Sequence, residues 1–227
     1  MHKFITQQAD LDTVLALMAQ GSVYGLDTEF IKVDTFWPKL GVFQINVNNH
    51  IFLLDGTTLD LAHFWQKIFA AQQNIFHACS EDIDLIYHYA DKQPLVNVFD
   101  TQVALSFLGH GLQVSYQNAL KLILNIDIDK DQTRSDWLAR PLSAAQIEYA
   151  ANDVLYIMQL ADELKAELEA KNLYGYMLED CQHLTQEIAL ETPQEKLYTD
   201  VGNYRHSRKQ LMQLQQLSVW REEMVKA

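Results

Sequence analysis

The first half of the chain alternates short apolar runs with stretches of helical periodicity, and this alternation constrains the fold more than any other feature. Three successive runs, residues 23–30, 41–47 and 51–54, have the length and composition of β-strands. The turn-forming pair Asn48-Asn49 separates the second run from the third, which favours a hairpin. Strands in succession, followed by alternation with helices, predict an α/β domain with a mixed central sheet flanked by helices.

The alternation continues through the middle of the chain. Helical periodicity over residues 59–71 is followed by a short buried strand at 74–77 and by a helix over 80–89. We expect Ser80 to be the N-cap of that helix. Asp82 would then lie in the first turn, where free backbone N–H groups and the helix dipole favour a carboxylate.

The second half of the chain is mainly helical in pattern. A last strand is expected at residues 96–99, with Asp100 or Thr101 opening the next helix. From Ser143 onward the helical pattern dominates, and Ser143 and Gln146 have the spacing of a capping box. This box predicts where the first helix of the helical half begins.

Two pairs of polar residues have spacings that place both side chains on one face of their element. Asp27 and Glu29 are two apart in an apolar run, and the period of a strand points both the same way. Tyr149 and Asp153 are four apart in a helical pattern, so they share a helix face. Carboxylates gathered with Asp82 would repel one another, and hard divalent cations with oxygen ligands relieve that repulsion. These five residues therefore predict a metal-binding hydrolase site.

The same blocks resemble a known family. The segment from Asp27 to Phe30, the block from His77 to Asp82 and the stretch from Tyr149 to Asp153 are similar, in order and spacing, to the three motifs of the DEDD exonucleases. The tyrosine four residues before the last aspartate marks the y branch. Residues 34–41 and 133–142 resemble the ribonuclease D family more narrowly, although Ala78 stands where many relatives have asparagine. The similarity runs from about residue 23 to 190 and implies a ribonuclease H-like exonuclease fold.

The resemblance also implies an activity, which is 3′–5′ exoribonuclease cleavage that releases nucleoside 5′-monophosphates. Two cations, Mg²⁺ or Mn²⁺, about 3.5–4 Å apart would provide a hydroxide nucleophile and stabilise the leaving oxygen. The family implies that Asp27 is shared between the metals, that Glu29 and Asp153 complete the nucleophile-side site, and that Asp82 mainly serves the second metal. Tyr149 is expected to orient the attacking water, because its reference pKa of about 10 makes it a poor free base.

Substrate contacts are predicted close to these motifs. Phe36 and Trp37 follow the first motif, where a loop could stack on a terminal base. Arg134 and Arg140 are rare cations shortly before the catalytic helix and are candidates for phosphate contact. The implied substrate is RNA, above all transfer RNA precursors whose 3′ ends are matured. Three neighbouring residues are interpreted as structural or packing residues: His77, Gln44 and Trp137.

The formal net charge of −13 is unusual for a nucleic-acid enzyme, in which a basic surface is the common feature. Part of that charge belongs to the carboxylates of the site, where cations would compensate it. Much of the rest lies between residues 162 and 195 and is interpreted as a solvated helix face. We therefore expect RNA binding to depend on local contacts and metals more than on a broad positive field.

The composition also bears on location. Charged residues interrupt the apolar runs well before the ~20 residues that a membrane-spanning helix needs. The amino terminus lacks the apolar core of a secretory signal. Cys79 and Cys181 are single thiols without metal-type spacing, which suits a reducing compartment. We expect a cytoplasmic monomer that does not interact with membranes.

Pro193 interrupts the helical pattern and marks the predicted domain boundary. Residues 1–192 are expected to form the exonuclease domain, and residues 193–227 a linker with the start of a helical domain. The stretch from Leu217 to Arg221 resembles the first helix of an HRDC domain, and basic residues precede it at Arg205, Arg208 and Lys209. Because the chain stops there, we expect it to be truncated from a longer protein.

Three other functions remain open at this stage. A DNA-trimming 3′–5′ exonuclease could use the same metal site, because only a contact to the 2′-hydroxyl separates the two sugars. A catalytically idle nucleic-acid-binding module is opposed by the intact set of five site residues. A metal-dependent phosphatase for small molecules would leave the HRDC-like tail unexplained.

Overall fold

The structure is a computed structural model, and it describes the chain apart from residues 1, 34, 36, 129–134, 191–192, 200, 204 and 227. The chain divides into two compact units, Met1–Ala189 and Leu190–Ala227. The predicted boundary after residue 192 lies close to this division. The expected HRDC-like nature of the second unit stays a prediction.

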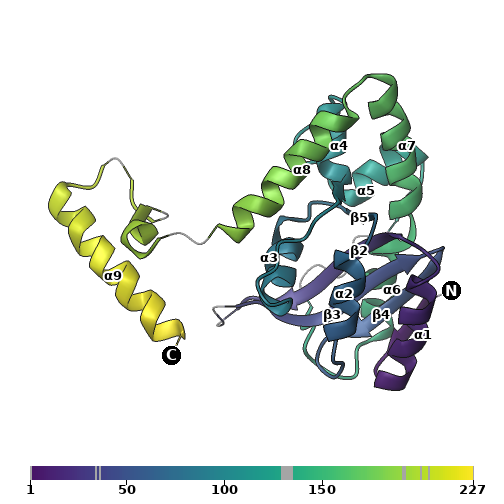
Figure 1. Cartoon of the computed structure of the whole chain (residues 1–227), viewed down its shortest axis with the longest axis horizontal. Helices are drawn as coiled ribbons and strands as arrows, with labels where there is room; N and C mark the ends of the chain where they lie inside the picture. Colours follow the sequence, from purple (N-terminus) through teal and green to yellow (C-terminus); the bar gives the residue numbers. More distant parts are fainter. Residues whose placement is uncertain are drawn as a thin grey trace. The chain divides into compact units, whose positions relative to one another are not determined.

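The first unit is built on a six-stranded sheet with the strand order β1-β4-β3-β2-β5-β6. Figure 1 labels the strands β2, β3, β4 and β5 of this sheet. Its strands are β1 (His2–Ile5), β2 (Val23–Ile31), β3 (Lys39–Val47), β4 (His50–Asp55), β5 (Gln73–Phe76) and β6 (Val98–Asp100). The central strands β2, β3 and β4 are antiparallel, whereas β1, β5 and β6 each run parallel to a neighbour. The sheet is therefore mixed, which confirms the predicted α/β fold class.

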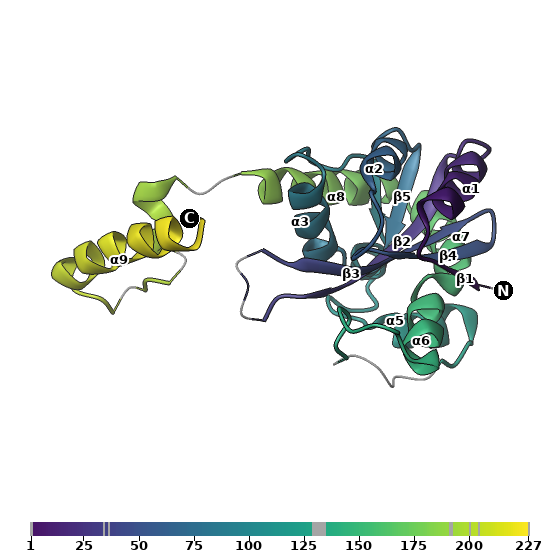
Figure 2. The ribbon, with the colours of Figure 1, turned by 90° about the horizontal axis from the view of Figure 1, so that it is seen from below.

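Helices cover both faces of this sheet. In the first unit they are α1 (Gln8–Met18), α2 (Ala62–Phe69), α3 (Ser80–Tyr89), α4 (Thr101–Phe107), α5 (Tyr116–Ala119), the π-helix η1 (Leu120–Leu124), α6 (Ala144–Leu155), α7 (Ile157–Ala170) and α8 (Tyr174–Ala189). Figure 2 shows α2 and α3 on one side of the sheet and α6 on the other. The second unit contains the 3₁₀ helix η2 (Gln194–Thr199) and α9 (Arg208–Lys226). None of the helices in the described residues is long and apolar enough to cross a membrane.

The hairpin between β3 and β4 forms where the sequence predicts it. Val47 pairs with His50, and the two residues between them, Asn48 and Asn49, have φ angles of 51° and 64°. A two-residue hairpin loop of this kind needs positive φ at both positions, which asparagine tolerates better than most residues. The turn chemistry therefore fixes the register of these two strands.

Helix starts agree with the sequence in two places and differ in one. The capping box of α6 is present, since Ser143 Oγ accepts from the Gln146 N–H at 3.2 Å and Gln146 Oε1 accepts from the Ser143 N–H at 3.0 Å. Asp100 caps α4. The prediction that Ser80 is the N-cap of α3 is wrong, because Ser80 is already helical and the N-cap position is Cys79.

Several boundaries were not recognised from local pattern. The strand β1 and the helix α1 were not predicted at all, and α2 is shorter than the predicted helix over residues 59–71. The buried core of the first unit includes large side chains from the sheet and from α2, among them Phe43, Phe64, Phe76 and Phe99.

Candidate active site

The five predicted site residues come from three elements and meet in one pocket of about 260 Å³. Asp27 and Glu29 lie on β2, Asp82 lies in the first turn of α3, and Tyr149 and Asp153 lie on α6. β2 lies next to β5 in the sheet, and the chain continues from β5 into α3. The start of α3 therefore lies close to β2, and the pocket lies between them.

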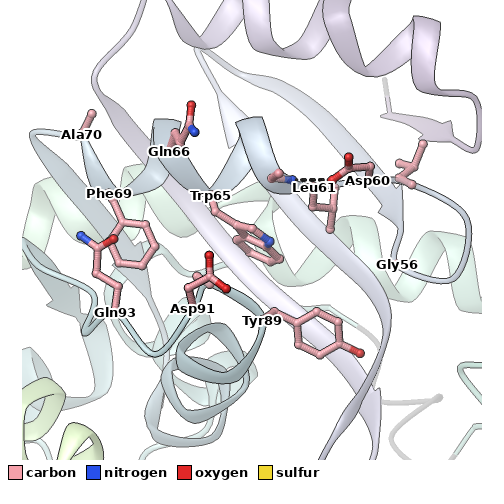
Figure 3. Close-up of a pocket in the computed structure, with 13 residues that line it drawn as sticks. Gly56, Asp60, Leu61, Trp65, Gln66, Phe69, Ala70, Tyr89, Asp91 and Gln93 are labelled. Carbon is pink, nitrogen blue, oxygen red and sulfur yellow. Dashed lines mark hydrogen bonds between the residues drawn. The ribbon is translucent and has the colours of Figure 1, made fainter.

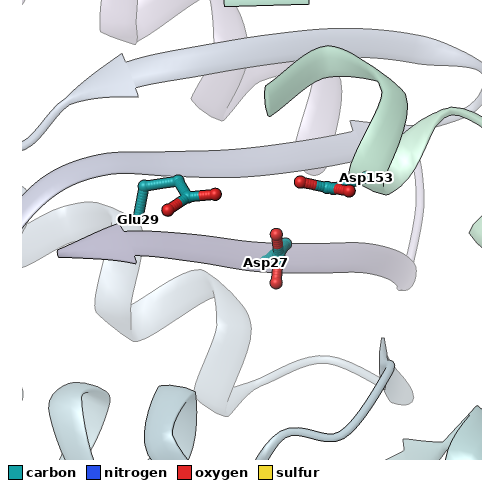
Figure 4. Close-up of side chains that lie close together, drawn as sticks. All are labelled: Asp27, Glu29 and Asp153. Carbon is teal, nitrogen blue, oxygen red and sulfur yellow. The ribbon is translucent and has the colours of Figure 1, made fainter. Parts of the chain in front are cut away.

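Three of the carboxylates form a tight cluster. Oxygens of Asp27, Glu29 and Asp153 all lie within 4.8 Å of one another (Figure 4). A set of carboxylate oxygens is the environment that hard divalent cations such as Mg²⁺ and Mn²⁺ prefer. Asp82 lies outside this cluster, and its carboxylate accepts a hydrogen bond from the Thr28 hydroxyl. The donor set fits a divalent cation, with Asp82 placed to one side.

Burial and mutual repulsion make these carboxyls weak acids. Burial raises the pKa of Asp27 well above its usual value, and the charges of Asp82, Asp153 and Glu29 raise it further. Burial, with the charge of Asp153, raises the pKa of Glu29 to about 9. Burial raises the pKa of Asp153 to about 7, against a hydrogen bond from Tyr149, and that of Asp82 to about 6. A cation that binds here must displace protons, so metal binding and proton release are linked.

Tyr149 presents its hydroxyl to the cluster as a hydrogen-bond donor. Tyr149 lies on the face of α6 that carries Asp153, and hydrogen bonding between the two groups acts on the pKa of each. Burial raises the pKa of Tyr149 above its usual value, and the nearby charge of Asp153 adds to that effect. The group therefore keeps its proton at neutral pH and acts through hydrogen bonding. Trp137 lies beside it with ring centroids 6.1 Å apart and is only 2% exposed, which confirms its interpretation as a packing residue.

Gln44 contacts the site, although the sequence interpretation treated it as a packing residue. It lies opposite Asp27 in the β2–β3 register, and its Nε2 is 3.4 Å from Asp27 Oδ2. It is fully buried, and its Oε1 atom has no hydrogen-bond partner among the described residues. Burying an amide side chain without hydrogen-bond partners costs free energy. A glutamine within an apolar strand was therefore the sequence signal that could have indicated a role for Gln44 at the site.

The loop between β5 and α3 is held by Asp100. Its carboxylate accepts from the backbone N–H groups of Ala78 at 3.0 Å and Cys79 at 2.9 Å, and also from two N–H groups of α4. Ala78 has a φ of +61°, a conformation that a non-glycine residue adopts at some cost. Asp100 therefore stabilises the turn that presents Asp82, a role that sequence reasoning missed. The turn also explains why α3 starts one residue earlier than a Ser80 cap would allow.

His77 lines the pocket with both ring nitrogens engaged. Its Nδ1 lies 2.8 Å from Thr101 Oγ1, and its Nε2 lies 2.9 Å from the Val114 carbonyl oxygen. Burial lowers the pKa of His77. These contacts support its interpretation as a structural residue.

The predicted substrate contacts have mixed outcomes. Phe36 and Arg134 lie outside the described residues, so their predictions remain as they were. Trp37 is 42% exposed, with its ring centroid 3.7 Å from that of His88. Stacking of Trp37 on a base remains a prediction.

Arg140 is committed to contacts within the chain. Its five N–H donors bond both carboxylate oxygens of Asp55 at 2.6 and 2.8 Å and the carbonyls of Gly41, Trp137 and Ala139, each at 2.8 Å. Burial alone would raise the pKa of Asp55, but the hydrogen bonds from Arg140 and Thr57 hold it below its usual value. Contact of Arg140 with phosphate would have to replace one of these bonds.

A second and larger hollow, of about 780 Å³, lies away from the carboxylates. It is bounded by α2 and by the end of α3, with the aromatic rings of Trp65, Phe69 and Tyr89 in its wall (Figure 3). It shares no residue with the carboxylate pocket. The candidate metal-binding group found among the described residues, Asp27, Glu29 and Asp153, lies in the smaller pocket.

The fold and the carboxylate cluster together place the chain among proteins with a 3′-5′ exonuclease domain. A family model described as 3′-5′ exonuclease matches residues 2–169, and the chain belongs to that family. Its resemblance to ribonuclease D is also confirmed. The chain is 34% identical to Ribonuclease D of Shewanella sp. (strain ANA-3), covering 97% of this chain and 58% of that protein. It is 35% identical to Ribonuclease D of Psychromonas ingrahamii, covering 96% and 59%.

A solved structure is similar over the whole chain. Escherichia coli RNase D, described as an exoribonuclease involved in structured RNA processing, matches with a TM-score of 0.91 and 27% identity. The match covers 100% of this chain and 61% of the E. coli chain, and it confirms the predicted ribonuclease H-like exonuclease fold. The chain thus spans about three fifths of the length of these relatives.

Proposed function

We propose that this chain is a 3′–5′ exoribonuclease of the ribonuclease D type, which removes nucleoside 5′-monophosphates one at a time from RNA. The observation that carries the proposal is the cluster of Asp27, Glu29 and Asp153 oxygens within 4.8 Å, in a pocket shared with Asp82 and Tyr149. Membership in the 3′-5′ exonuclease family supports both the reaction and its direction.

Two divalent cations, Mg²⁺ or Mn²⁺, would be held by the carboxylates. Asp27, Glu29 and Asp153 are the ligands proposed for the first, and Asp82 with Asp27 for the second. Bound there, the cations would provide a hydroxide nucleophile near neutral pH and stabilise charge on the leaving oxygen. The chain orients these ligands through neighbouring groups, since Gln44 lies beside Asp27 and the Thr28 hydroxyl donates to Asp82.

Tyr149 is proposed to align the attacking water. Tyr149 lies one helical turn before Asp153 on the same face of α6, and both line the carboxylate pocket. A raised pKa keeps the phenol protonated, so its contribution is a positioned hydrogen bond and not removal of a proton.

We propose structured RNA as the substrate class, with transfer RNA precursors as the physiological case and the cytoplasm as the place of action. Support comes from the E. coli relative, which is described as acting in structured RNA processing. We propose that the chain acts as a monomer.

A matched cleavage assay tests the proposal. RNA and DNA single strands of one sequence, labelled at the 5′ end, are incubated with Mg²⁺, with Mn²⁺ or with a chelator. The expected result is stepwise shortening of the labelled RNA from its 3′ end, release of unlabelled nucleoside 5′-monophosphates that chromatography identifies, and no reaction with the chelator. Cleavage of a circular RNA would contradict an exonuclease, and faster cleavage of DNA would favour the DNA-trimming alternative.

Variants assign the reaction to the site. Asp27→Asn, Asp153→Asn and Asp82→Asn should each abolish hydrolysis, because each removes a charged ligand. Asp84→Asn is the control, since Asp84 lies on the same helix but pairs with Lys32 and His88 outside the pocket. Full activity of Asp27→Asn or Asp153→Asn would contradict the site assignment.

A further inference from the structure

The helix that carries Asp153 is broken directly after the site. α6 ends at Leu155 and α7 begins at Ile157, and Tyr156 between them has φ −109° and ψ 3°. A break in a helix frees backbone N–H and carbonyl groups around it, and these need other partners when they are buried. Val154 and Ile157 on either side of this break are buried.

Side chains from two other elements bond the backbone at the break. Asn46 on β3 is 1% exposed, and its Nδ2 donates to the Val154 carbonyl at 2.8 Å and to the Leu155 carbonyl at 3.4 Å. The Tyr116 hydroxyl, at the start of α5, accepts from the Tyr156 N–H at 3.3 Å. One residue therefore bonds the carbonyls before the break and the other bonds the N–H at it.

The sheet also approaches the break closely. A Cβ atom on Gly25 would lie 2.3 Å from Ile157 Cγ2, so only glycine allows this spacing. Gly25 pairs with Asn46 in the β2–β3 register and is two residues from Asp27. The backbone next to Asp153 is thus fixed against the strand that carries the other two carboxylates of the cluster.

We infer that Asn46 and Tyr116 are positioning residues that hold Asp153 in the carboxylate cluster by fixing the break between α6 and α7. The inference rests on the proposed function, because it assumes that the carboxylate cluster binds a metal ion. Metal sites require ligand atoms to be held within about 0.5 Å of their productive positions. Among the described residues, the Asn46 side chain bonds only this backbone, so its effect on the metal must pass through Asp153.

The chain contains a matched control for Asn46. Asn74 on β5 is fully buried, and its Nδ2 donates to the Ile68 carbonyl at 2.8 Å and to the Val96 carbonyl at 3.3 Å. Its Oδ1, like that of Asn46, has no partner in the described part of the chain. Ile68 lies at the end of α2, which carries no site residue. Removing either amide therefore breaks a similar pair of bonds, but only Asn46 adjoins the site.

The test compares Asn46→Ala, Tyr116→Phe and Asn74→Ala in the whole chain. Mn²⁺ binding to the metal-free protein is measured by titration calorimetry, and thermal unfolding is measured without metal. We expect Asn46→Ala and Tyr116→Phe to weaken Mn²⁺ binding by about 10-fold or more, the size of effect typical of groups behind metal ligands. Asn74→Ala should lower the unfolding temperature about as much as Asn46→Ala while Mn²⁺ affinity stays within about twofold.

Hydrolysis provides a second readout. RNA turnover by Asn46→Ala should fall at low Mn²⁺ and recover as the Mn²⁺ concentration is raised, because the ligand is displaced and not removed. Asn46→Ser is the second variant if Asn46→Ala fails to fold, because Tyr116 lines the carboxylate pocket itself and Tyr116→Phe alone would not separate the two routes.

Two results would overturn the inference. Equal Mn²⁺ affinity in Asn46→Ala and the parent, or equal weakening in Asn46→Ala and Asn74→Ala, would show that the bonds at the break have only a general structural role. A parent chain that binds no Mn²⁺ and cleaves no RNA would overturn the proposed function as well. The two failures are therefore distinguishable.

Discussion

At the scale of single residues, the buried carboxylates of the site lower the stability of the folded chain when no cation is bound. Asp153 and Glu29 have pKa values raised to about 7 and about 9, mainly because burial disfavours their charged forms. An acid whose pKa is higher in the folded than in the unfolded chain binds its proton more tightly when folded. Its contribution to stability is present at low pH and is lost as the pH rises through the folded pKa.

We therefore predict that the metal-free chain loses stability between about pH 5 and pH 9. Asp153→Asn should flatten this dependence and raise the unfolding temperature at pH 8 by at least about 2–4 °C, because asparagine carries no charge to bury. Thermal unfolding with a chelator, recorded across the pH range, measures both effects.

The control is Asp55, a carboxyl whose pKa is shifted in the opposite direction. The pKa of Asp55 is held below its usual value by its hydrogen bonds, so its contribution is present above pH 4 or so and is lost on acidification. Asp55→Asn should therefore destabilise the chain at pH 8. Stabilisation by both variants, or by neither, would contradict the assignment of the shifts.

Tyr149→Phe isolates the proposed hydrogen bond to the water. The ring and its packing beside Trp137 are kept, so the fold and metal binding should change little. Positioning groups of this kind contribute about 10²–10⁴-fold, and we expect a loss of that order in kcat with KM nearly unchanged. Turnover within about threefold of the parent, at saturating metal and RNA, would show that the hydroxyl only packs against Asp153.

At the scale of elements, local pattern predicted those features whose cause is local. The turn at Asn48 and Asn49 and the capping box at Ser143 depend on neighbouring residues, and both are correct. The strand period and the helical turn placed the members of each site pair on one face. Their convergence followed from the family resemblance, because spacing within a segment carries no information on how segments pack.

The contacts that were missed join residues far apart in sequence. Asn46 bonds a carbonyl 108 residues away, and Arg140 bonds Asp55 at a separation of 85. β1 was also missed, because its four residues become a strand only by pairing with β4. The sequence pattern within a single helix or strand carries no information about such contacts.

Arg140 yields a prediction at this scale, because it joins the segment before α6 to β3 and β4. Lysine keeps the charge but lacks the planar set of donors that bonds Asp55 and three carbonyls at once. Arg140→Lys should therefore cost about 2–4 kcal/mol of stability, as expected when hydrogen bonds to a buried charge are lost. RNA affinity at a temperature where the variant is folded should remain near that of the parent.

Denaturant unfolding and RNA binding by fluorescence anisotropy separate the two roles of Arg140. Lys121→Ala is the control, since its ion pair with Asp127 is exposed and should contribute no more than about 1 kcal/mol. If Arg140→Lys is as stable as the parent but binds RNA several-fold more weakly, Arg140 contacts phosphate and the structural role is wrong.

At the scale of the whole molecule, charge limits how the chain can hold RNA. The net charge is −13, and Arg140 already makes five hydrogen bonds within the fold. The second unit carries three exposed basic residues close together in sequence, namely Arg205 before α9 and Arg208 and Lys209 at the start of α9. We therefore expect these three cations to provide much of the phosphate contact available to this chain.

The last prediction follows from counterion release. Each phosphate contact on single-stranded nucleic acid contributes about 0.7 to the slope of log affinity against log salt concentration. Replacing Arg205, Arg208 and Lys209 together by alanine should therefore weaken RNA binding and lower the slope by up to about 2. A charge-matched control replaces Lys3, Lys121 and Lys171, which pair with Asp10, Asp127 and Glu167. With a chelator present to prevent cleavage, anisotropy titrations from about 50 to 200 mM salt should separate the two triple variants. Equal slopes would mean that RNA responds to the overall charge of the chain and not to these three residues.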